Sequence, residues 1–196
     1  MMIAIIHDPL RTDRMEILLK ELAQQNITEY RLIPAIKESK NPVRNISQAH
    51  KSCVRLAEEL SLESITILED DVRFVCPSAF HRFMELHREL PEDWDVFLSG
   101  AYDAKISSQV GQLAKVSRFS GLHCYMISRK YYSTFLKADE RVNVDKWMST
   151  PGYGSSNAYL AYPMLALQHD GYSDNVRRIT NYNQLVEEKY PLWKCE

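Results

Sequence analysis

The stretch SITILEDDVRF, residues 64–74, sets an apolar run directly against three acids before the chain returns to apolar residues. The run SITIL has the composition and length of a buried strand. Because an uncompensated charge is costly to bury, the strand must end at a solvent-facing edge where Glu69, Asp70 and Asp71 emerge. The stretch therefore predicts a central strand with a cluster of acids at its carboxyl end.

Strand-like and helix-like segments alternate along the rest of the chain. Short apolar runs predict strands at residues 2–6, 30–33, 64–68, 94–98, 123–127 and 161–167. Apolar positions at helical spacing predict helices between these runs, among them one over 47–60 and one opened by a capping box of Asp13 and Glu16. The mostly polar residues 101–118 predict a long surface loop. This alternation indicates an α/β fold with a largely parallel central sheet flanked by helices, whose ligands bind beyond the carboxyl ends of the strands.

Length and charge limit the possible functions. The chain has 196 residues, of which 45% are hydrophobic, which suits one domain with a sizeable core. We expect residues 1–175 to form this domain and residues 176–196 to form a C-terminal tail packed on it. A net charge of -2 from 24 basic and 26 acidic residues gives no cationic surface for phosphate neutralisation, so nucleic acid is not expected as a partner.

The cellular compartment follows from the apolar segments and the cysteines. The first apolar run is too short for a signal peptide, and no later stretch is long enough to cross a bilayer, so we expect a cytoplasmic protein. Cys53, Cys76, Cys124 and Cys195 lack the paired spacing of a zinc site. In a reducing compartment they would remain thiols, so disulfides are not expected.

The acids after the central strand suggest a metal site. On an extended segment Glu69 and Asp71 would point to one side and Asp70 to the other, so two carboxylates could share one cation. Oxygen ligands suit Mn²⁺ or Mg²⁺, which complete their coordination with water and substrate phosphates. The alternative is that the acids cap the next helix or solvate a loop.

Two arginines follow the first predicted strand, where a nucleotide would lie. The guanidinium groups of Arg11 and Arg14 match phosphate oxygens well, although both could also be solvated charges of the first helical turn. His50 falls near the apolar stripe of its helix, which favours a hydrogen-bonded structural histidine over a ligand.

Seven segments, in order, resemble glycosyltransferase family 25, the lipopolysaccharide galactosyltransferase-like group with a GT-A fold. They are IAIIHDPLRTDRMEILLKEL, ISQAHKSCVRLAEE, ITILEDDVRF, WDVFLSG, GLHCYMISRKYY, VDKW and AYPMLALQHDGYSDN. The first and the last of these set the extent of the resemblance, from about residue 2 to residue 175. The chain departs from the family at Ala49-His50, where the family commonly has a serine before the histidine.

The resemblance implies a metal-dependent inverting glycosyltransferase that moves a hexose, most simply galactose from UDP-galactose, to a glycan or lipooligosaccharide acceptor. A lipid-linked acceptor would place the enzyme at the inner face of the membrane, as a peripheral protein. Asp71 would then be the first metal ligand and Glu69 the second. His169 would be a third ligand, with Asp170 as its substitute, although His169 could equally be an exposed loop histidine. Asp70 would bind ribose or donor-sugar hydroxyls.

Asp145, in the VDKW segment, corresponds to the candidate general base of the resemblance. An inverting displacement needs a carboxylate that takes the proton of the acceptor hydroxyl. Trp147 beside it could stack on a sugar ring. An aspartate at the start of a short helix can equally be an N-cap, and that alternative remains open.

Two other functions remain open from the sequence. A non-catalytic module that binds a sugar nucleotide or a glycan could keep the donor pocket and lack the base. A metal-dependent phosphodiesterase would also use clustered acids, although two-metal hydrolases need more His and Asp ligands. Neither a GxxxxGK[ST] loop nor a GxGxxG motif occurs, which disfavours kinases and dinucleotide oxidoreductases.

Overall fold

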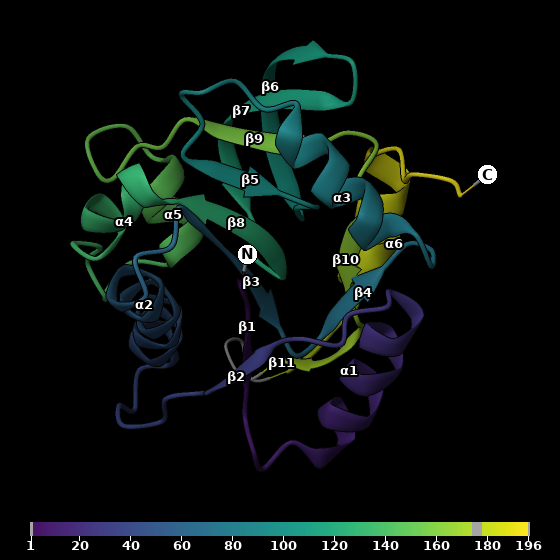
Figure 1. The fold of residues 1–196 in the computed structure, drawn as a ribbon. Coiled ribbons are helices and arrows are strands. Elements are labelled where there is room, and N and C mark those ends of the chain that lie inside the picture. The colour runs from purple at the N-terminus through teal and green to yellow at the C-terminus, as the bar shows by residue number, and fades with distance from the viewer. Residues whose placement is uncertain (1, 174–177, 196) are drawn as a thin grey trace.

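The computed structural model describes residues 2–173 and 178–195. Its centre is an eight-stranded sheet with the strand order β2-β1-β3-β8-β5-β9-β7-β6 (Figure 1). The bounds of these strands are Met2–His7 (β1), Arg31–Pro34 (β2), Ser64–Glu69 (β3), Val96–Leu98 (β5), Asp103–Val110 (β6), Leu113–Ser120 (β7), Cys124–Ser128 (β8) and Ala158–Ala161 (β9).

The sheet is mixed but mainly parallel. β1 runs parallel to both β2 and β3, and β5 runs parallel to β9. β8 is antiparallel to its neighbours β3 and β5, and β7 is antiparallel to β9 and β6. All strands of the sheet except β8 and β7 therefore share one direction, which confirms the predicted α/β fold with a largely parallel sheet.

Helices cover both faces of this sheet. α2, α4 and α5 lie on one side of it, and α1 and α3 lie on the other (Figure 1). The helix bounds are Thr12–Gln24 (α1), Pro42–Glu59 (α2), Ala79–Arg88 (α3), Arg129–Phe135 (α4), Val144–Ser149 (α5) and Tyr182–Lys189 (α6). Two small antiparallel pairs complete the fold, from the strands Val72–Phe74 (β4) with Ala166–Gln168 (β10) and Gly171–Ser173 (β11) with Arg178–Thr180 (β12).

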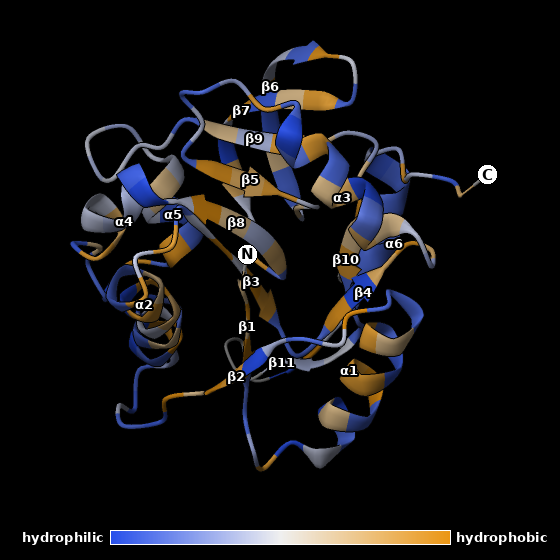
Figure 2. Ribbon diagram, viewed as in Figure 1, coloured by the Kyte–Doolittle hydropathy of each residue, from blue (hydrophilic) through white to orange (hydrophobic). Residues whose placement is uncertain are grey.

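Each face of the sheet has its own hydrophobic core. Cys53 and Val54 of α2 pack into one core, while Leu18 and Leu22 of α1 pack into the other. Hydrophobic residues gather on the central strands, and the helices carry both hydrophobic and hydrophilic residues (Figure 2). Burial of these apolar side chains is the main source of the stability of the fold.

The predicted loop over residues 101–118 is wrong, because the hairpin of β6 and β7 occupies most of it. β6 is the last strand of the sheet, and all its residues are exposed or half-buried. Only Ala104 and Ile106 of β6 pack against the core, and an edge strand with so little burial lacks the sustained apolar alternation that marks a strand in sequence. The predicted strand at 161–167 is also divided, since β9 ends at Ala161 and β10 begins at Ala166.

Two helix starts differ from the sequence prediction. The N-cap of α1 is Arg11, whose guanidinium binds Asp13, so the expected capping box with Glu16 does not form. α2 begins five residues earlier than expected, because the Asn41 side chain accepts a hydrogen bond from the backbone N–H of Val43 at 3.0 Å. Pro42 then takes the first helical position, where its fixed φ and missing N–H are tolerated.

The C-terminal segment returns to the domain. Val186 and Tyr190 are buried in the same core as α2, and Leu192 forms a bridge with Met164. Cys76 and Cys195, which are 119 residues apart, form a disulfide, so the prediction of free thiols is wrong for this pair. The spacing of cysteines along the sequence does not show which distant cysteines come together when the chain folds. The predicted boundary between residues 175 and 176 lies outside the described residues.

The sequence analysis expected no segment that crosses a bilayer, and this expectation can be compared with the helices of the structure. Within residues 2–173 and 178–195, no helix combines the length and apolar character needed to span a bilayer.

Candidate functional site

The three acids lie where β3 ends. Glu69 is the last residue of β3, and Asp70 and Asp71 form the turn that leads into β4. A turn breaks the alternation of an extended segment, so the expected placement of Asp70 on the face opposite Asp71 is wrong. Nη1 of Arg14 lies 2.7 Å from Oδ1 of Asp70 and 2.8 Å from Oδ2 of Asp71, so one guanidinium contacts both carboxylates.

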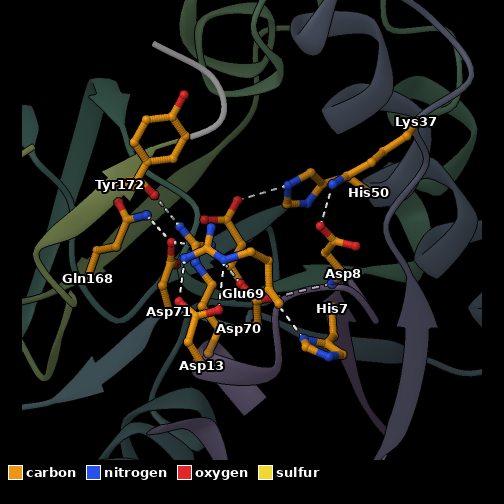
Figure 3. A network of polar contacts seen from close by, with 12 residues as sticks. His7, Asp8, Asp13, Lys37, His50, Glu69, Asp70, Asp71, Gln168 and Tyr172 are labelled. Atoms are coloured by element: carbon orange, nitrogen blue, oxygen red, sulfur yellow. Dashed lines mark hydrogen bonds and ion pairs between the residues drawn. The ribbon is translucent and has the colours of Figure 1, made fainter. Parts of the chain in front are cut away.

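Asp70 is a structural junction between β1, α1 and the acidic turn (Figure 3). His7 Nδ1 donates to Oδ2 of Asp70 at 2.9 Å, and the backbone N–H of Asp8 donates to the same oxygen at 3.3 Å. Arg14 engages the other oxygen, and Asp70 is 6% exposed. These partners compensate the buried charge, as buried carboxylates require.

Asp71 has one engaged and one unpartnered oxygen. Oδ2 forms an ion pair with Nη1 of Arg14 and accepts a hydrogen bond from Nε2 of Gln168 on β10. Oδ1 is buried and has no hydrogen-bond partner among the described residues. Burial, and after it the negative charge of Glu69, raises the pKa of Asp71 to about 7, although Arg14 acts in the opposite direction. A buried oxygen without a partner is costly, which makes it a natural position for a ligand atom.

His50 of α2 positions Glu69 (Figure 3). Its Nε2 lies 3.1 Å from Oε1 of Glu69, and its Nδ1 lies 2.8 Å from the Tyr125 hydroxyl. Burial raises the pKa of Tyr125 well above its ordinary value, so the hydroxyl keeps its proton and donates to Nδ1, while Nε2 donates to Glu69. Burial acts to raise the pKa of Glu69, but the hydrogen bond from His50 and the nearby charge of Arg14 help to hold that pKa below its ordinary value.

One cavity of about 290 Å³ opens beside the acidic turn. Six of the seven predicted site residues line it, namely Arg11, Arg14, Glu69, Asp70, Asp71 and Asp145. The sequence analysis missed several polar residues of its wall, among them Asp8, Lys37, Asn45 and Gln168, and assigned no site role to His50. Asp8 directly follows β1, so its position after a buried strand was a signal that could have found it. Lys37 belongs to a segment without a motif, and Gln168 lies in the last of the seven family-like segments, where only His169 and Asp170 were given a role.

Asp145 reaches the cavity from the first turn of α5. The N-cap of this helix is Asn143, so Asp145 does not cap it. Its Oδ2 accepts a hydrogen bond from the backbone N–H of Gly121 at 3.1 Å, and its Oδ1 accepts one from that of Lys146 at 2.7 Å. Burial raises the pKa of Asp145 above its ordinary value, against the effect of these two hydrogen bonds.

The expected sugar-stacking role of Trp147 is not supported by its position. Trp147 is 7% exposed, belongs to the hydrophobic core and does not line the cavity. Its ring lies so close to Gly154 that a Cβ at that position would come within 1.7 Å of it. A ring packed in this way is not available to a sugar.

His169 is the one predicted site residue outside the cavity. Its Nε2 lies 3.2 Å from Oε1 of Glu21, and it lines a separate hollow with Asp170. Only its backbone reaches the acidic turn, through a 2.7 Å hydrogen bond from its N–H to the carbonyl of Asp71. The structure therefore does not bring the His169 side chain to Glu69 and Asp71.

The donor set for a metal is accordingly small. Among residues 2–173 and 178–195, no group of three or more His, Cys, Asp or Glu side chains is arranged to hold a metal ion. The unpartnered Oδ1 of Asp71 and the carboxylate of Glu69 nevertheless fit a hard divalent cation that takes the rest of its ligands from phosphate and water.

The chain was compared with known proteins by sequence and by structure. No protein-family model matches the sequence, and no curated protein is significantly similar to it. The structure is similar to a glycosyltransferase involved in the glycosylation of the major capsid of PBCV-1, with a TM-score of 0.53 and 12% identity over 94% of this chain and 98% of that one. It is also similar to a protein from STIV, with a TM-score of 0.55 and 13% identity over 91% and 93% of the two chains.

A third similar structure contains ligands. It is a Drosophila β1,4-galactosyltransferase 7 mutant in complex with manganese, UDP-Gal and xylobiose, with a TM-score of 0.50 and 8% identity over 100% of this chain and 76% of that one. These likenesses show a GT-A-like fold, as the resemblance implied. None of them is specific to family 25, so that assignment stays a proposal.

Proposed function

We propose that this protein is a glycosyltransferase that moves a hexose from a nucleotide diphosphate donor to a hydroxyl of a glycan or lipooligosaccharide acceptor, with inversion. The proposal rests on one observation, that a single cavity of a GT-A-like fold brings the acidic turn and Asp145 together. We further propose galactose and UDP as the donor groups. The sequence resemblance to family 25 and the UDP-Gal complex of a similar structure support that choice.

The acidic turn would serve the donor. Asp71, through Oδ1, and Glu69, held by His50, would bind a Mn²⁺ or Mg²⁺ ion, which would neutralise the charge of the departing diphosphate. Lys37 and Arg11 add positive charge to the same cavity wall and would attract the phosphates. His169 is kept only as a weaker candidate ligand, since its side chain would have to leave Glu21.

Asp145 would serve the acceptor as general base. Its carboxylate would take the proton of the acceptor hydroxyl while the hydroxyl oxygen bonds to the anomeric carbon. The bond from that carbon to the diphosphate breaks in the same step, and its electron pair leaves with the diphosphate. The backbone N–H groups of Gly121 and Lys146 fix both carboxylate oxygens, which orients the base before the acceptor arrives.

A panel of nucleotide sugars tests the donor assignment. We expect UDP-galactose with Mn²⁺ to raise the thermal unfolding midpoint of the protein more than GDP- or CMP-sugars do, because a ligand that binds the native state stabilises it. Asp71→Asn should abolish most of this shift. Glu29→Gln, which changes an exposed acid outside the cavity, is the matched control and should keep it.

Two outcomes of the nucleotide-sugar panel would contradict the proposal. If no nucleotide sugar shifts the midpoint at millimolar concentration, with or without Mn²⁺, the cavity is not a donor site. If a donor binds but is neither hydrolysed nor transferred, the protein is the non-catalytic sugar-nucleotide module that the sequence left open.

A further inference from the structure

Arg14 occupies an unusual position for a residue expected to bind phosphate. It lies in the first turn of α1, with its side chain 18% exposed, and the carboxylates of Asp70 and Asp71 are 7% exposed. Nη1 contacts both carboxylates, and Nη2 donates to the backbone carbonyl of Tyr172 at 3.0 Å. The guanidinium therefore contacts three oxygen atoms, two of which belong to the acidic turn.

The same oxygens are those that a divalent cation would need. Oδ2 of Asp71 is taken by Arg14 and Gln168, and Oδ1 is buried without a partner. A cation on Oδ1 would share one carboxylate with a guanidinium, so two positive charges would lie within a few ångströms in a poorly solvated place. The remaining negative charge of Glu69 is partly satisfied by His50.

We infer that Arg14 is the built-in counter-ion of the acidic turn and competes with divalent metal for it, so that the site binds metal weakly unless a diphosphate is bound too. The inference rests on the metal site of the proposed function. Arg14 neutralises part of the negative charge of Asp70 and Asp71. A bound diphosphate would supply the additional negative charge that a divalent cation needs. Arg14 thereby makes metal and nucleotide bind together, and it acts on metal affinity instead of on phosphate recognition.

Titration of Mn²⁺ alone, followed by electron paramagnetic resonance of the free ion at pH 7.5, tests the competition without any nucleotide. We expect Arg14→Met to bind Mn²⁺ roughly tenfold more tightly than the wild-type protein, because one positive charge leaves the ligand carboxylate. Arg11→Met is the matched control. It removes the same charge from the same cavity wall, but the Arg11 guanidinium binds Asp13, so its Mn²⁺ affinity should stay within about twofold of wild type.

Arg14→Lys is a second variant, which tests the inference even if Arg14→Met does not fold. Its ammonium keeps the charge but is a compact point that cannot hold both carboxylates as the fork does, so we expect an intermediate gain, about threefold. Equal Mn²⁺ affinity in the wild-type protein and in any folded Arg14 variant, whether tight or weak, would overturn the inference. Equal gains for Arg14→Met and Arg11→Met would also overturn it, since they would indicate only a general field. Because no nucleotide is present, a failure of the donor panel would leave this result unaffected.

Discussion

A general base has to be positioned and also ionised when the acceptor binds. Asp145 meets the first condition through Gly121 and Lys146, whose backbone N–H groups bind its two oxygens. The second condition depends on pH, because burial raises its pKa. Both properties can be tested at this residue.

Asp145→Asn should separate transfer from donor binding. The amide has nearly the size of the carboxylate but cannot accept the proton, so we expect kcat and kcat/KM to fall together by roughly two to four orders of magnitude. The thermal shift caused by UDP-galactose should barely change. Near-normal turnover at saturating acceptor would exclude Asp145 as the base.

At saturating Mn²⁺ and donor, which keep the proposed ligand Asp71 ionised, the pH profile of transfer should show an acidic limb set by Asp145. The base works only when ionised, so activity should fall as pH falls through its pKa, which lies above the ordinary value of 3.8 because of burial. We expect about a tenfold loss of kcat/KM for each pH unit below that pKa. The residual activity of Asp145→Asn should lack this limb. An identical limb in the variant would assign it to another group.

At the scale of elements, the approach of β5 to β10 depends on a glycine. A Cβ at Gly100 would lie 1.9 Å from the carbonyl oxygen of Ala166 and 3.0 Å from Nε2 of His123. His123 donates to that carbonyl through Nε2 at 3.0 Å, and β10 continues to Gln168, which binds Asp71. The acidic turn therefore depends on how closely these two segments pack.

Gly100→Ala should weaken the fold and the donor site together. Backbone has to move to admit the methyl group, so we expect a loss of about 3 kcal/mol in the free energy of unfolding, measured by urea denaturation. Gly171→Ala is the control, because a Cβ there meets no heavy atom within 4 Å. Equal stability of the two variants would show that β10 adjusts freely.

At the scale of the whole molecule, the disulfide closes the chain on itself. Cys76 follows β4, and Cys195 lies in the segment that returns past Met164. Because the bridge spans 119 residues, its main effect is to restrict the unfolded chain.

Cys195→Ser should destabilise the oxidised protein without changing its fold. Loss of a long loop closure is expected to lower the free energy of unfolding by roughly 2 to 4 kcal/mol, measured by urea denaturation without reductant. With excess reductant the wild-type protein and the variant should unfold alike. A difference that persists under reduction would indicate a packing role of Cys195 instead of a covalent one.

The sequence by itself determined the elements whose pattern is local. The apolar run of β3, the acids at its carboxyl end and the amphipathic α2 follow from composition and periodicity, since each pattern spans only one element. The acids after β3 meet Arg11 and Arg14 in one cavity because the carboxyl ends of the parallel strands β1 and β3 share an edge of the sheet. Asp145, on α5, was expected only from the family resemblance.

Only the tertiary structure decided which charge meets which. Arg14 reaches Asp70 across 56 positions of sequence, and His169 reaches Glu21 across 148. A guanidinium or an imidazole carries no sequence signal of its partner, because the energy of an ion pair depends on distance and burial in space and not on spacing along the chain. The burial of Trp147 and the edge strand β6 were hidden for the same reason, as both depend on neighbours that arrive from elsewhere in the chain.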